Sequence, residues 1–331
     1  MNCRRKAGAV MMLDLDVVAL GDAMVSFSPK GYGRLEQARE LDVSPTGAEA
    51  NAAVALARLG LRVGWFSKLP EHPLSRLIVD AVRAHGVDVS RVVWAPEGRL
   101  GTLFYEKAVP PRPARVWYDR GGSAFTTLGA GEVDWGYVTS ARVVLMAGTA
   151  PALSDGLKDL ALRIAREAGR AGKLFALDVN YRAKLWSPVD AAEYLSTLLP
   201  LTGLLFCARR DADRVLGLRG ALEAVARELS EKYGVPRVVV TMGADGSRAF
   251  ADGVLYRHCP LPRVTPLDPV GAGDAFAAGF LYGYLTGGVQ RGLDWGGALG
   301  ALHYTLPGDF AYVNRAEVAE FLASGDPEIQ R

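Results

Sequence analysis

Residues 268–281 read DPVGAGDAFAAGFL, and this stretch places a glycine-rich turn directly before an apolar run. Gly271 and Gly273 allow the backbone to turn tightly and to approach a ligand closely. The apolar run from Ala275 predicts a helix, and the first N–H groups of a helix have no partner within it. Such a helix start is a ready site for an anion, so the stretch predicts a phosphate-binding turn.

Asp274 lies in the first turn of this predicted helix, where the helix dipole favours an ionised carboxylate. An ionised carboxylate beside a phosphate site can accept the proton of an attacking hydroxyl. Gly-X-Gly-Asp alone is also typical of a simple helix cap, and the tetrapeptide leaves this alternative open. Two other phosphate motifs are excluded. No Gly-Lys-Ser or Gly-Lys-Thr occurs, and Phe276 stands where a dinucleotide fingerprint has its third glycine.

Away from this stretch, short apolar runs alternate with longer helical patterns along the chain. Alternating strands and helices predict an α/β fold with a mostly parallel sheet that is covered on both faces. The predicted strands are residues 17–21, 63–69, 142–147, 174–179, 204–207 and 237–242. The predicted helices are residues 48–59, 74–85, 154–171, 191–199, 222–233 and 275–285.

Two segments, residues 31–44 and 98–122, interrupt the alternation and are richer in charge, proline and glycine. The second segment contains two extended candidates, residues 102–109 and 115–120, which prolines separate. This pattern predicts a small antiparallel flap, and a flap inserted in an α/β domain is suited to act as a lid. An ordinary surface excursion is the alternative.

Composition narrows the class of protein. The formal net charge is +2 over 331 residues without a basic stripe, so a nucleic-acid partner is not indicated, and no stretch reaches the length of a membrane-spanning helix. Cys3, Cys207 and Cys259 lie far apart, which fits neither a metal site nor a disulfide framework and favours a reducing cytoplasm. We expect a single domain over residues 14–325, preceded by a tail at residues 1–13.

Residues 268–274 resemble the C-terminal signature of the ribokinase-like (PfkB-type) carbohydrate kinases. Residues 47–60, GAEANAAVALARLG, resemble the N-terminal signature of this family. Residues 241–246, TMGADG, are similar to its nucleotide-side strand and turn. The order and spacing of the three segments also match the family. The resemblance implies a doubly wound α/β domain with a small β lid, and a kinase that uses ATP and Mg²⁺.

The resemblance also implies roles for individual residues. Asp274 would be the catalytic base. The implied anion hole consists of Gly271, Ala272 and Gly273. The residues implied to lie along the ATP are Thr241, Gly243 and Gly246. Mg²⁺ would bridge the phosphates largely through water, and Asp211 alone keeps a carboxylate where the family often has Asn-x-x-Glu. Asp268 is a candidate ligand for a monovalent cation.

Two further segments indicate the acceptor. Residues 178–186, DVNYRAKLW, and residues 148–154, GTAPALS, resemble segments of 2-keto-3-deoxygluconate kinases. Ribose and fructose kinases usually carry an aspartate where Ser26 stands, which counts against a simple ribokinase or fructokinase. The residues implied to contact the sugar acid are Gly47, Asn51, Phe104, Tyr118, Arg120 and Arg182, where Phe104 replaces a frequent lid tyrosine.

Arginine can bind a carboxylate with two hydrogen bonds, so Arg182, just after a predicted strand, is the first candidate for the acid group, with Arg120 closing from the lid. An alternative is that Arg182 pairs with Asp178 or a helix end. The expected reaction converts 2-keto-3-deoxygluconate and ATP into the 6-phosphate and ADP. A kinase for fructose, ribose or adenosine and a non-catalytic sugar or nucleotide sensor are the alternatives. The resemblance further implies a homo-oligomer formed through the lid.

Overall fold

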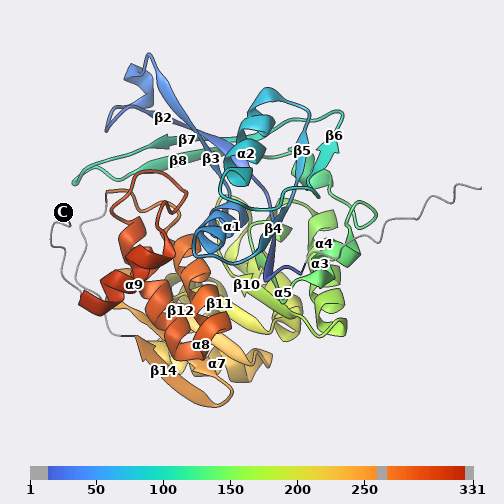
Figure 1. Cartoon of the computed structure of the whole chain (residues 1–331), viewed down its shortest axis with the longest axis vertical. Coiled ribbons are helices and arrows are strands. Elements are labelled where there is room, and N and C mark those ends of the chain that lie inside the picture. Colours follow the sequence, from blue (N-terminus) through green and yellow to red (C-terminus); the bar gives the residue numbers. More distant parts are fainter. Residues whose placement is uncertain (1–13, 259–266, 325–331) are drawn as a thin grey trace, which may run out of the picture.

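An eight-stranded sheet forms the centre of the molecule in the computed structural model, which describes residues 14–258 and 267–324 (Figure 1). The strand order is β14-β13-β12-β11-β10-β9-β1-β4. The strands from β12 to β4 are parallel, and β13 pairs antiparallel with both β12 and β14, so β13 alone runs in the opposite direction. The strands are β1 (Val17–Leu20), β4 (Val63–Phe66), β9 (Val143–Ala147), β10 (Leu174–Asp178), β11 (Leu204–Ala208), β12 (Arg237–Thr241), β13 (Ser247–Ala251) and β14 (Val254–His258). The expected tail at residues 1–13, Cys3, Cys259 and residue 325 lie outside the described residues.

Helices cover both faces of this sheet. Successive strand residues point to opposite faces, so Leu177 belongs to one hydrophobic core and its neighbour Ala176 to the other. The helices of the first core are α3 (Trp135–Ser140), α4 (Asp155–Arg170), α5 (Pro188–Leu198), α6 (Arg209–Leu216) and α7 (Leu222–Tyr233). Those of the second are α1 (Ala48–Arg58), α2 (Pro73–Arg83), α8 (Ala272–His303) and α9 (Arg315–Ser324). The doubly wound α/β fold is therefore confirmed.

Helix α8 consists of two helical segments that meet at Gly288, whose φ of +85° lies outside the helical region. The segments pack backbone to backbone. A Cβ atom on Gly279 would lie 2.5 Å from the Trp295 carbonyl oxygen, so only glycine allows this approach. The second segment therefore supports the first, which begins at Ala272 and carries Asp274. In the described part of the chain, no helix is long and apolar enough to cross a membrane.

A second, four-stranded sheet projects from one end of the molecule (Figure 1). Its order is β3-β2-β7-β8, and β7 pairs antiparallel with β8 as the flap prediction requires. Lys184, in the loop after β10, donates a 2.6 Å hydrogen bond to the Val116 carbonyl oxygen of β8, which holds this sheet against the body. The strands are β2 (Met24–Pro29), β3 (Leu41–Thr46), β7 (Gly101–Glu106) and β8 (Arg115–Asp119). We call this sheet the lid.

The lid and one predicted strand differ from the sequence prediction. The lid contains β2, which lies outside both predicted lid segments. The predicted strand at residues 63–69 is divided, because its end forms a separate two-stranded sheet. The strands of this sheet are β5 (Lys68–Pro70) and β6 (Val93–Ala95). Short 3₁₀ helices occur at Leu35–Gln37, Ala124–Thr127, Pro151–Leu153, Leu199–Leu201 and Gly243–Asp245.

Candidate active site

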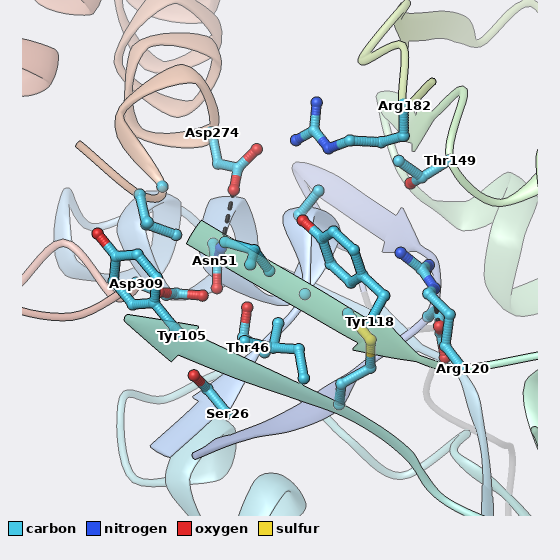
Figure 2. Close-up of a pocket in the computed structure, with 18 of the residues that line it drawn as sticks. Ser26, Thr46, Asn51, Tyr105, Tyr118, Arg120, Thr149, Arg182, Asp274 and Asp309 are labelled. Atoms are coloured by element: carbon cyan, nitrogen blue, oxygen red, sulfur yellow. Dashed lines mark hydrogen bonds and ion pairs between the residues drawn. The ribbon is translucent and has the colours of Figure 1, made fainter. Parts of the chain in front are cut away.

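A pocket lies between the lid, the start of α1 and the start of α8 (Figure 2). It brings together residues that are far apart in sequence. The predicted residues that line it are Gly47, Asn51, Tyr118, Arg120, Arg182, Gly271 and Asp274. The pocket also contains residues to which the sequence assigned no role in the site, among them Asp22, Thr46, Tyr105 and Asp309.

Asp274 lies in the first turn of α8 and is 9% exposed. The Asn51 side-chain amide donates a 2.7 Å hydrogen bond to its Oδ2 atom (Figure 2). Burial raises the pKa of Asp274 to about 7, the Asn51 hydrogen bond opposes this rise, and the nearby Asp178 charge adds to it. Burial therefore opposes the ionisation that the start of the helix favours.

The turn before Asp274 depends on Gly271. This residue has a φ of +80°, in the left-handed region that favours glycine. A Cβ atom there would also lie 2.5 Å from the Asp309 carbonyl oxygen. His303 Nε2 donates a 2.6 Å hydrogen bond to the Val270 carbonyl oxygen, which helps to hold the turn in place. The first amides of α8 thus start from a rigidly held turn and lack acceptors within the helix.

Arg182 lies in the loop after β10. It extends toward Asp274 in Figure 2 and donates a 3.2 Å hydrogen bond to the Tyr181 carbonyl oxygen. Within residues 14–258 and 267–324, no carboxylate lies within 4.0 Å of its guanidinium, so the expected alternative of an ion pair with Asp178 is not formed. Arg182 still lowers the pKa of the buried Asp178, which burial and Asp211 raise to about 6. Its charge is therefore available to a ligand.

Arg120, unlike Arg182, forms a buried ion pair. Its Nη2 atom lies 2.9 Å from Oδ2 of Asp22, and the two side chains are 7% and 3% exposed. Burial raises the pKa of Asp22, and Arg120 opposes this rise. The Arg120 guanidinium also lies 5.8 Å from the centre of the Tyr118 ring. The pair presents hydrogen-bonding groups to the pocket with little net charge.

The structure corrects the prediction for Phe104. It does not line the pocket but stacks on Phe27, with ring centres 5.6 Å apart. Side chains alternate along a strand, so its neighbours Leu103 and Tyr105 face the pocket instead. The sequence alternation along β7 could have identified Tyr105 only if the register of the lid were known.

The residues predicted to bind the nucleotide lie outside this pocket. Thr241 ends β12, and Gly243 and Gly246 follow in the β12–β13 turn with φ of +56° and +89°. Asp211 lies in the first turn of α6 and accepts a 3.3 Å hydrogen bond from the Tyr181 amide. All four are at the carboxyl ends of neighbouring strands, the edge of a parallel sheet where ligands bind. Gly243 leaves open space beside its backbone.

Asp268 does not fit the expected monovalent-cation site. Its Oδ1 atom accepts hydrogen bonds from the Tyr105 hydroxyl (3.0 Å) and the Val270 amide (3.2 Å). Its Oδ2 atom accepts one from the Gly308 amide (3.2 Å) and lies 3.1 Å from Lys107 Nζ. Protein donors, one of them an ammonium group, thus surround the carboxylate. No group of three or more His, Cys, Asp or Glu side chains in the described ranges is arranged to hold a metal ion.

Known proteins resemble the chain over nearly its whole length. A 2-dehydro-3-deoxygalactonokinase from Haloferax volcanii is 38% identical, over 96% of this chain and 99% of that protein. A 2-dehydro-3-deoxygluconokinase from Bacillus subtilis is 33% identical, over 94% and 97%. The crystal structure of 2-dehydro-3-deoxygluconokinase from Thermotoga maritima has a TM-score of 0.87 at 29% identity, over 94% and 98%. Residues 14–305 match the model of the pfkB family carbohydrate kinases, and the chain therefore belongs to this family of sugar kinases.

Proposed function

We propose that the protein transfers a phosphoryl group from ATP to the 6-hydroxyl of 2-keto-3-deoxygluconate, also written 2-dehydro-3-deoxygluconate. The observation that carries this proposal is Arg182, a pocket cation without an ion-pair partner among the described residues. A guanidinium binds a carboxylate well, and a neutral sugar offers it no such group. The names of the relatives from Bacillus subtilis and Thermotoga maritima support the same acceptor.

In the proposed reaction, Asp274 accepts the proton of the attacking hydroxyl, and its hydrogen bond from Asn51 orients the carboxylate. The amides of Gly271, Ala272 and Gly273 stabilise the charge on the transferred group. Positioning and charge stabilisation account for most of catalysis in phosphoryl transfer, and lid closure excludes water as a competing acceptor.

ATP and Mg²⁺ are the cofactors that membership of the family supports. ATP would supply the phosphoryl group, and Mg²⁺ would supply positive charge that offsets the negative charge of the phosphates. Asp211 would provide the hard oxygen that Mg²⁺ prefers, directly or through water. The residues that we propose for the ATP phosphates and ribose are Thr241, Gly243 and Gly246.

A second acceptor, the galactonate epimer, is favoured by the name of the Haloferax volcanii relative. The two sugar acids share the carboxylate, the keto group and the 6-hydroxyl, so Arg182 and Asp274 serve both. The contacts to the hydroxyl whose configuration differs decide between them. The Asp22–Arg120 pair is suited to this task, because both side chains line the pocket and present donors and acceptors.

An ADP-release assay with ATP and Mg²⁺ tests the proposal. The acceptor panel is 2-keto-3-deoxygluconate, its galactonate epimer, 5-keto-2-deoxygluconate, fructose, ribose and adenosine. We expect turnover on one or both of the first two sugar acids, with kcat/KM at least ~100-fold above that on the neutral sugars, as expected for loss of a charged hydrogen bond. Equal or better turnover on a neutral acceptor contradicts the acid assignment. Sugar binding by calorimetry without turnover on any acceptor supports a sensor.

We also propose that residues 14–325 act as one unit in which the lid closes over the pocket and joins a second copy of the chain. The outer face of the lid supports this proposal. Val43, Phe27, Phe104 and Trp117 are register neighbours across all the strands, on the face opposite the pocket. The exposed fractions of Val43 and Trp117 are 43% and 40%. An exposed apolar row of this kind is typical of a protein interface.

A further inference from the structure

Lys107 and Asp268 form an ion pair between the lid and the body. Lys107 directly follows β7, and Asp268 begins the glycine-rich stretch before α8. The Lys107 Nζ atom lies 3.1 Å from Asp268 Oδ2, and the two side chains are 25% and 1% exposed. An exposed ion pair would contribute little, but removing one partner of a buried pair leaves an uncompensated charge.

Asp268 connects this lysine to the phosphate-binding turn. One carboxylate oxygen accepts a hydrogen bond from the amide of Val270, which directly precedes Gly271. The other accepts a hydrogen bond from the Gly308 amide. The carbonyl oxygen of the next residue, Asp309, packs against Gly271 so closely that a Cβ atom would not fit. Asp268 therefore joins the two loops that shape the turn.

A second buried acid makes the lysine charge more important. Burial raises the pKa of Asp309 to about 6, a Thr46 hydrogen bond opposes the rise, Asp268 adds to it, and Lys107 opposes it. Two carboxylates thus lie close together beside a turn suited to bind phosphate. Without a cation, the charge of one carboxylate would disfavour ionisation of the other. The same negative charge would also disfavour binding of an anion at the turn.

We propose that the Lys107 ammonium is the resident cation of the Asp268 loop and takes the place of a monovalent metal ion there. The lid delivers it together with Tyr105, whose hydroxyl donates a 3.0 Å hydrogen bond to Asp268. A movement of the lid away from the body would remove both contacts from Asp268. Lys107 acts through Asp268 and is a positioning residue. The inference rests on the kinase activity proposed above.

Salt-dependent kinetics test this role. The kcat of the wild type, Lys107→Met and Lys107→Arg is measured with saturating ATP and sugar in choline, potassium or ammonium chloride at one ionic strength. Lys30→Met is the matched control, because Lys30 is also a lid lysine but pairs with Glu40 where both side chains are exposed. We expect the wild type and the control to be equally active in the three salts.

For Lys107→Met in choline chloride, we expect kcat to fall on the order of 10- to 100-fold, the effect of losing a charge-assisted contact to a buried group. Potassium and ammonium ions should restore it, because they can enter the space left by the ammonium group. Lys107→Arg should keep most of the activity in choline chloride, because it retains the charge. A purely structural role would not produce rescue by small cations.

A second readout does not depend on activity. A cation that binds the folded protein raises the melting temperature, so potassium should stabilise Lys107→Met and leave the wild type unchanged relative to choline. This comparison tests the role of Lys107 separately from the proposed kinase reaction. It applies even if the wild type phosphorylates none of the acceptors. If Lys107→Met does not fold, Lys107→Gln is read by the same criteria.

Three results would overturn the inference. The first is a wild type that needs potassium for turnover or gains stability from it. The second is a Lys107→Met variant with wild-type kcat in choline chloride. The third is a loss of activity in Lys107→Met that neither potassium nor ammonium restores, together with no cation-dependent change in its melting temperature.

Discussion

The Arg120 guanidinium lies 2.9 Å from the Asp22 carboxylate, and both groups are buried in the wall of the pocket. Arg182 shares this pocket and has no carboxylate within ion-pair distance among residues 14–258 and 267–324. The two arginines therefore differ in what they can offer a ligand. Arg120 brings its own counter-ion, whereas Arg182 brings a positive charge.

Removing Arg120 should destabilise the fold. Arg120→Ala leaves Asp22 buried without a partner, and we expect the free energy of unfolding to fall by about 3–5 kcal/mol. Chemical denaturation at neutral pH measures this change. The double variant Asp22→Asn, Arg120→Gln removes both charges and should lose less stability than Arg120→Ala alone. Equal losses would show that the ion pair is not what Arg120 contributes.

Replacing Arg182 should separate acid from neutral acceptors. We expect Arg182→Ala to raise KM for 2-keto-3-deoxygluconate by about 10- to 100-fold, since a charged hydrogen bond is lost, with little change for fructose. Arg182→Lys should recover only part of the loss, because an ammonium group does not match a carboxylate with two parallel hydrogen bonds. Steady-state kinetics on both acceptors measure this. A common fall in kcat on all acceptors would instead place Arg182 at the transferred phosphoryl group.

Asp274 should be needed for turnover but not for binding. For Asp274→Asn we expect kcat to fall about 10²–10⁴-fold, the usual contribution of a general base. The amide keeps an acceptor for the Asn51 hydrogen bond, so the dissociation constant for the sugar should change little. Rapid-quench kinetics and calorimetry measure the two quantities. Near-normal turnover in this variant would remove Asp274 from the role of base.

The raised pKa of Asp274 predicts opposite effects of pH on activity and stability. The base must be deprotonated, so kcat/KM should fall as pH decreases through about 7. The folded protein binds this proton more tightly than the unfolded chain, so the contribution of Asp274 to stability decreases as pH rises from about 4 to about 7. Asp274→Asn lacks this penalty, and its melting temperature relative to the wild type should increase across that range. A pH-independent difference would contradict the burial argument.

The exposed apolar row on the lid should control assembly of the protein with a second copy of the chain. Trp117→Glu places a charge at the β8 end of the exposed apolar row, and we expect it to convert a dimer into a monomer. Light scattering coupled to size exclusion measures the mass of both proteins. Val189→Glu is a matched control, because Val189 is also apolar and exposed but lies at the start of α5. A monomeric wild type, or a dimeric Trp117→Glu, would contradict assembly through this row.

The sequence by itself determined the framework and the centre of the candidate site. Alternating apolar runs and helical patterns predicted the parallel sheet with helices on both faces. Gly271 and Asp274 could be identified because a left-handed turn at a helix start is a local property, encoded within a few consecutive residues.

Only the tertiary structure decided which groups face the ligand and with what charge. Phe104 turned away and Tyr105 turned inward because the register of the lid strands sets the orientation of each side chain. Arg120 met Asp22, and Lys107 met Asp268, across long stretches of sequence. Such pairings and the desolvation that shifts a pKa arise from packing between distant segments, which no local sequence pattern records.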